Sequence, residues 1–240
     1  MQKNIAFDNR YKMNHKNRGY AVIIDNYEVA GSSPISSHTT DVQNFRRTFS
    51  KLGFNIQIYE NLTAQKLLTI MKKYAKEDYS DTDCFVAIFL SHGTTDNKNV
   101  EYICGSDGNL ASIEELTHPF QINQTLNDKP KIFFFDACRG SKSEPSFAKL
   151  SSNQKSSINS SNSGYESSKA HYFTHADFFF GFATVHGYVS YFTQNQDSWY
   201  STEVCNAIDK HADTDHLVDM ITEAHRIIKA KHPNLTPEIR

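Results

Sequence analysis

Short apolar runs alternate with segments of helical periodicity along most of this chain. Such runs, rich in Val, Ile and Phe, predict buried strands at residues 19–25, 54–59, 84–92, 131–138 and 177–184. Apolar residues three or four apart predict helices at residues 40–52, 63–77, 114–126, 199–211 and 214–231. A shorter piece at 102–110 is typical of a hairpin. This alternation predicts an α/β fold with a doubly wound, mostly parallel sheet and helices on both faces.

One segment interrupts the alternation. Residues 141–170 are dominated by Ser, Asn and Lys and contain few large apolar residues, which is typical of a solvated linker. We therefore divide the chain into a short N-terminal segment (1–18), a large part (19–140), the linker (141–170) and a small part (171–240).

Composition narrows the possible partners. The chain has 240 residues and a formal net charge of −2, which gives no general attraction to nucleic acid or to an anionic membrane. The first twenty residues lack the apolar core of a secretory signal, and no apolar run is long enough to span a bilayer. The four cysteines lack metal-binding or paired spacing, so we expect reduced, cytosolic usage without metal or cofactor.

Two strand ends carry the candidate chemistry. The run CFVAIFLSHG ends at His92 and Gly93, and the run KIFFFDACRG reaches Cys138 at its end. A single cysteine at a strand end is more often a small buried hydrophobic residue than a nucleophile. If the two strands are parallel neighbours, however, their ends bring an imidazole and a thiol to one edge, as nucleophilic cysteine catalysis requires.

Several motifs in order along the chain resemble those of caspases with short prodomains. The matching pieces are YKMNHKNRGYAVII at 11–24, SHG at 91–93, KIFFFDACRG at 131–140 and ADFFFGFATVHGYVSY at 176–191. The resemblance implies a three-layer sandwich and a cytoplasmic zymogen that acts as a thiol protease in apoptosis. It also implies that Cys138 is the nucleophile, that His92 transfers protons, and that the N–H groups of Gly93 and Cys138 form the oxyanion hole.

The residues that would select the substrate depart from the caspase pattern. Caspases bind an aspartate side chain with two arginines and a glutamine, whereas alignment puts Ser37 and Phe192 at the arginine positions and Asp136 at the glutamine position. The substrate-binding residues implied by the resemblance are Ser37, Ser91, Asp136, Val189, Tyr191, Phe192, Thr193 and Trp199. For Trp199, a place in the core is an alternative.

The exchange of charge predicts altered specificity. Two like charges about 4 Å apart repel by roughly 4 kcal/mol at an effective dielectric constant of 20, so Asp136 would oppose an aspartate substrate. Metacaspases and paracaspases keep an acidic residue here and cleave after Arg or Lys, and Asp136 resembles theirs. The composition of the linker agrees with cleavage after Lys, because residues 141–170 contain no aspartate but four lysines: Lys142, Lys149, Lys155 and Lys169.

Three interpretations stay open. The chain is a cysteine endopeptidase with non-Asp, Arg/Lys specificity, a pseudo-caspase that binds and regulates another caspase, or an ordinary Asp-specific apoptotic caspase. Its partners are then protein or peptide substrates, or another caspase. Caspases continue beyond a segment resembling LTPEIR (235–240) into a strand that pairs across a dimer axis. If the protein ends at this segment, the usual homodimer is not expected; if the sequence is a fragment, nothing follows for the dimer.

Overall fold

A central six-stranded sheet organises the molecule. The computed structural model describes residues 10–36, 38–140, 177–188, 190 and 198–240. The strand order is β2-β1-β3-β7-β8-β9, and every neighbouring pair is parallel except β8 and β9, which are antiparallel. The strands are β1 (Tyr20–Asp25), β2 (Asn55–Glu60), β3 (Phe85–Leu90), β7 (Lys131–Asp136), β8 (Phe178–Phe182) and β9 (Glu238–Ile239). The predicted mostly parallel α/β sheet is confirmed.

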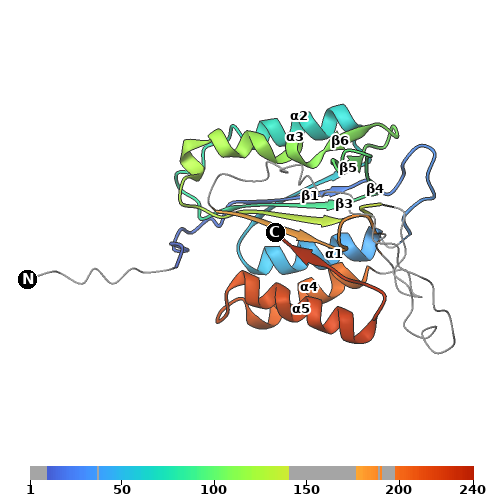
Figure 1. Cartoon of the computed structure of the whole chain (residues 1–240). Helices are drawn as coiled ribbons and strands as arrows, with labels where there is room; N and C mark the ends of the chain where they lie inside the picture. Colours follow the sequence, from blue (N-terminus) through green and yellow to red (C-terminus); the bar gives the residue numbers. More distant parts are fainter. Residues whose placement is uncertain (1–9, 37, 141–176, 189, 191–197) are drawn as a thin grey trace, which may run out of the picture.

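Helices cover both faces of this sheet, as Figure 1 shows. α2 (Ala64–Tyr74) and α3 (Ile113–Thr117) lie on one face. On the other face lie α1 (His38–Lys51), α4 (Trp199–His211) and α5 (Leu217–Lys231). The result is the three-layer arrangement that the alternation of strands and helices predicts.

Each face has its own apolar core, because successive strand residues point to opposite sides. Phe133 and Phe135 of β7 stack on Phe180 and Phe182 of β8, with centroid separations of 5.5 and 5.2 Å, on the α2 side. Phe134 belongs to the opposite core with the apolar residues of α1 and α4. All six residues of β3 are buried, as expected for a central parallel strand covered on both faces.

A small antiparallel sheet follows β3. It consists of β4 (Gly93–Thr95), β5 (Glu101–Cys104) and β6 (Leu110–Ser112). β5 and β6 form the hairpin expected at 102–110, whereas β4 was not predicted. β4 begins one residue after His92, so the small sheet lies next to the candidate site.

The predicted boundaries of four elements differ from the observed ones. The helix expected at 114–126 is α3 followed by two 3-10 helices, η1 (His118–Ile122) and η2 (Gln124–Leu126), because Pro119 cannot donate the backbone hydrogen bond of an α-helix. The strands expected to end at His92 and Cys138 end at Leu90 and Asp136, which form their last pair. α5 begins at Leu217, after a turn that includes Thr214.

The segment LTPEIR (235–240), which was expected only to precede a further strand, contains the strand β9 itself. Glu238 pairs with Phe182 and Ile239 with Gly181, and the backbone of Arg240 exchanges hydrogen bonds of 2.8 and 2.9 Å with Phe180. β9 is too short to be predicted from sequence periodicity. The expected linker lies outside the described residues. Within the described part, no helix is both long and apolar enough for a membrane span.

Candidate active site

The two predicted catalytic residues lie on neighbouring strand ends. β3 and β7 pair in parallel with Leu90 opposite Asp136, so His92 and Cys138 each follow the last pair by two residues at the same sheet edge. Both side chains are half-buried, which leaves them accessible and still supported. The condition stated for an imidazole–thiol pair, parallel adjacent strands, is therefore met.

The ring of His92 is fixed by the loop after β1. Its Nε2 lies 2.8 Å from the carbonyl oxygen of Ser33. A carbonyl can only accept, so Nε2 must donate, and in the neutral ring Nδ1 then carries the free lone pair. Among the described residues no hydrogen bond joins His92 to Cys138, and such bonds are often long before substrate binds. The arrangement leaves Nδ1 as the atom that would transfer protons.

Cys138 has a polar neighbour that sequence reasoning missed. The backbone N–H of Ser190 points to the sulfur at 3.4 Å, and its hydroxyl oxygen lies 3.5 Å from the same atom. An N–H donor facing sulfur stabilises a thiolate. The available signal was the position of Ser190 in GYVSY, between Val189 and Tyr191, which were both assigned to substrate binding.

Glycine is required after His92 because two backbones meet there. A Cβ atom on Gly93 would lie 2.5 Å from the carbonyl oxygen of Cys138 and 2.9 Å from that of Tyr102. Any side chain would therefore push β4 away from the segment that carries the nucleophile. This close approach agrees with the expected oxyanion hole, whose assignment to Gly93 and Cys138 stays a prediction.

Asp136 binds the amino-terminal end of α4. The carboxylate is 6% exposed and accepts hydrogen bonds from the hydroxyls of Ser198 and Ser201, the latter at 2.8 Å. Ser198 is also the N-cap of α4. The positive end of a helix favours an anion at this place. Burial raises the pKa of Asp136 above its usual value, while the serine hydrogen bonds act in the opposite direction.

One oxygen of this carboxylate has no such support. Oδ1 of Asp136 is buried and has no hydrogen-bond partner among the described residues. A second buried carboxylate, that of Asp41 on α1, accepts from the backbone N–H of Ser198 at 3.2 Å. Two acidic groups therefore meet at the start of α4, and sequence reasoning had identified only one of them.

The remaining predicted substrate-binding residues differ in what the structure shows. Ser91 is 4% exposed and donates its hydroxyl to the carbonyl of Cys104 at 2.9 Å. Trp199 is half-buried, stacks on His232 and packs against the core between the sheet and α4, which agrees with the alternative stated for it. Their roles in substrate binding stay predictions. The other five lie outside the described residues: Ser37, Val189, Tyr191, Phe192 and Thr193.

Candidate metal ligands do not gather around the dyad. Across the described ranges, no group of three or more His, Cys, Asp or Glu side chains is arranged to hold a metal ion. The four cysteines are free thiols, of which Cys84 and Cys205 are buried.

Comparison with known proteins gives the family. The family model for the caspase domain matches residues 18–239, so the chain belongs to the caspase family of cysteine peptidases. It is 29% identical to chicken (Gallus gallus) caspase-6 over 98% of this chain and 80% of that protein. It is 27% identical to bovine (Bos taurus) caspase-3 over 99% and 82%, and 34% identical to mouse (Mus musculus) caspase-8 over 84% and 43%.

Proposed function

We propose that this protein is a cytosolic cysteine endopeptidase of programmed cell death or related signalling that cleaves after Arg or Lys and not after Asp. Cys138 attacks the scissile carbonyl after Nδ1 of His92 takes its proton, and the N–H groups of Gly93 and Cys138 bind the oxyanion. The C–N bond then breaks as Nδ1 gives that proton to the leaving amine, and water hydrolyses the thioester to release the acid and restore the thiol. Family membership and the placement of His92 and Cys138 at one sheet edge support this chemistry.

The observation that carries the specificity is the unpaired oxygen of Asp136. Its Oδ1 lacks a partner among the described residues and lies two positions before the nucleophile. A guanidinium or ammonium group there would form a charge-assisted hydrogen bond, whereas a substrate carboxylate would be repelled. Asp41, at the same end of α4, adds a second acidic group to this region.

A second candidate function has its own support. Asp136 already has structural partners in Ser198 and Ser201, so the carboxylate is explained without any substrate. A protein in which this residue only stabilises the start of α4 would act by binding another caspase and would not need to cleave. This pseudo-caspase would show no turnover and would co-purify with its caspase.

Peptides that differ only in the residue before the cleaved bond test these alternatives. We expect turnover of Arg and Lys peptides, abolished by Cys138→Ala and retained in the matched control Cys104→Ala. Asp136→Asn keeps the size and the contacts with serine but removes the charge, so kcat/KM for Arg peptides should fall about 10- to 100-fold. Efficient turnover of Asp peptides would identify an ordinary caspase, and silence on every peptide would favour the binding protein.

A further inference from the structure

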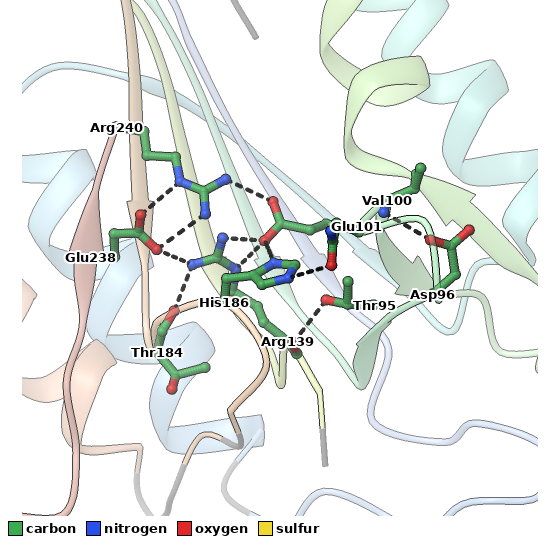
Figure 2. Close-up of polar contacts among 10 residues, drawn as sticks. Thr95, Asp96, Val100, Glu101, Arg139, Thr184, His186, Glu238 and Arg240 are labelled. Atoms are coloured by element: carbon green, nitrogen blue, oxygen red, sulfur yellow. Dashed lines mark hydrogen bonds and ion pairs between the residues drawn. The ribbon is translucent and has the colours of Figure 1, made fainter. Parts of the chain in front are cut away.

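Arg139, the residue directly after Cys138, is held at every polar group of its side chain (Figure 2). The side chain is 3% exposed. Its Nε donates to Glu101 of β5 at 2.7 Å, and Nη2 donates to the same carboxylate. Nη1 donates to the carbonyl of Thr184 at 2.8 Å and also to Glu238 of β9. Three segments far apart in sequence therefore fix one guanidinium group.

The backbone of Arg139 is held equally firmly. Its N–H donates to the carbonyl of Tyr188 at 2.8 Å. Its own carbonyl accepts from the N–H of Gly187 at 2.6 Å and from the hydroxyl of Thr95 at 2.8 Å. Cys138 thus lies between the end of β7 and a residue that cannot shift without breaking several hydrogen bonds.

Thr95 and Glu101 connect this residue to the other half of the expected oxyanion hole. They are paired opposite one another on β4 and β5, and β4 begins at Gly93. One of the two holds the carbonyl of Arg139 and the other holds its guanidinium. The β4–β5 pair, whose first strand carries Gly93, and the segment that carries Cys138 are therefore tied together at two points, one on each strand.

Glu238 of β9 and Arg240, which directly follows β9, complete the charge balance of the cluster. Glu101 is 1% exposed and, besides Arg139, faces Arg240 at 3.0 Å and Nδ1 of His186 at 3.2 Å. Arg240 also pairs with Glu238 at 2.7 Å. A buried carboxylate between two arginines needs its partners, because an unpaired buried charge is strongly unfavourable. Arg240 and Glu238 are 28% and 27% exposed, so they form the outer side of the cluster.

We propose that Thr95, Glu101, Glu238 and Arg240 are positioning residues for the reaction. Acting through Arg139, they set the spacing between the N–H groups of Gly93 and Cys138. We call these four residues with Arg139 the Arg139 clamp. The inference rests on the proposed function, because the oxyanion hole is part of it. Such donors are effective only when they are fixed in advance where the oxyanion forms.

Thr95 offers the sharper test. Thr95→Val removes the hydroxyl and nearly keeps the shape, Thr95→Ser keeps the hydroxyl, and Thr94→Val is the matched control on the same strand. We expect Thr95→Val to lower kcat about 10-fold with KM unchanged within about 2-fold, and Thr95→Ser to recover most of the loss. Alkylation of Cys138 by iodoacetamide needs the thiolate but no oxyanion hole, so its rate should stay the same.

Arg240 tests the outer side of the clamp. Arg240→Gln should lower kcat in the same way, again without changing alkylation of Cys138, whereas Lys210→Gln, which removes a surface cation beside Glu223, should leave kcat unchanged. Unchanged kcat in both Thr95→Val and Arg240→Gln would overturn the proposal. If kcat and the alkylation rate of Cys138 fall together, or if Thr95→Ser does not recover kcat, the role of these residues is merely structural. Either result would also overturn the proposal.

Amide hydrogen exchange separates failure of this inference from failure of the proposed function. If the parent protein turns over no peptide, the proposed enzyme is wrong, but the clamp is still measurable. The Arg139 clamp would be supported if the amides of residues 138–140 exchange about 10-fold faster in Thr95→Val and in Arg240→Gln than in the parent, while Thr94→Val exchanges at the parent's rate. Exchange equal to that of the parent would refute it.

Discussion

At the residue scale, the four cysteines differ in the environment of their sulfur. Burial raises the pKa of Cys84 and of Cys205 to about 12. Burial also raises the pKa of Cys104, with a contribution from nearby Cys138. Cys138 is half-buried at a sheet edge and receives an N–H from Ser190. The thiolate is the reactive form, so these environments predict different reaction rates.

We expect iodoacetamide to label Cys138 first in the folded protein and to leave Cys84 and Cys205 unlabelled. At about pH 8 a thiol with a pKa near 12 is a thiolate in only about one molecule in 10,000. Peptide mapping by mass spectrometry gives the order of labelling. Protein unfolded in guanidinium chloride is the control, because all four cysteines should then react. Labelling of Cys84 or Cys205 before Cys138 in folded protein would contradict the expectation.

Sequence predicted the positions of His92 and Cys138 because each closely follows a buried strand whose apolar run is visible locally. It could not predict Ser190 beside Cys138, or Ser198 beside Asp136, since these contacts join residues 52 and 62 positions apart. Both depend on where the chain returns after β8. Charge at position 136 was visible in the sequence, but the partners of that charge were not.

At the element scale, long periodic segments were predicted well and short ones were not. α4 was expected at 199–211 and spans Trp199–His211. β4 and β9 have three and two residues, too few to show a period, and they exist because a neighbouring strand pairs with them. The structural surroundings of the nucleophile include both of these unpredicted strands, which is why the Arg139 clamp was not foreseen.

The packing of α5 on α4 buries a histidine. His225 lies beside Tyr200, with ring centroids 6.0 Å apart, and its Nε2 has no hydrogen-bond partner among the described residues. Burial lowers the pKa of His225 from 6.5 to about 4, because the apolar surroundings disfavour the charged ring. The folded protein therefore resists a proton that the unfolded chain accepts.

This difference predicts a loss of stability in mild acid. Since the folded pKa of His225 is below the unfolded pKa, the unfolded state binds more protons between them. The free energy of unfolding should fall as pH drops from about 6.5 to about 4, by up to about 3 kcal/mol from this residue. Urea denaturation across that range measures it. His225→Leu should remove this part of the pH dependence of the unfolding free energy. The control His216→Gln, at an exposed position, should leave it unchanged. If His225→Leu and the parent protein show the same pH dependence, the assignment to His225 is wrong.

At the scale of the whole molecule, the parts before and after the expected linker share one sheet, and both contribute to each of its two apolar cores. β7 pairs with β8 along five residue pairs, and Phe133 and Phe135 stack on Phe180 and Phe182 across that join. Away from the site, the hydroxyl of Tyr11 donates to Asp177 at 2.8 Å, and Asp177 also faces the buried Lys131 at 3.7 Å. The Lys131–Asp177 contact ties one end of the β7–β8 pair, and the contacts of Arg139 with Thr184 and Glu238 tie the other end.

Cleavage of the linker should therefore leave the two parts associated. Trypsin should cut first at Lys142, Lys149, Lys155 or Lys169, because the composition of 141–170 is that of a solvated segment. A denaturing gel should show two fragments, while size-exclusion chromatography should show one species close to the 27.4 kDa of the intact chain. The reason is that separation would expose the aromatic faces of β7 and β8 and leave the Glu101–Arg139 pair without Glu238. Fragments that elute apart without denaturant would show that the sheet does not join the two parts as the contacts require. First cuts at the lysines of α1 or α2 would instead show that 141–170 is not the most accessible segment.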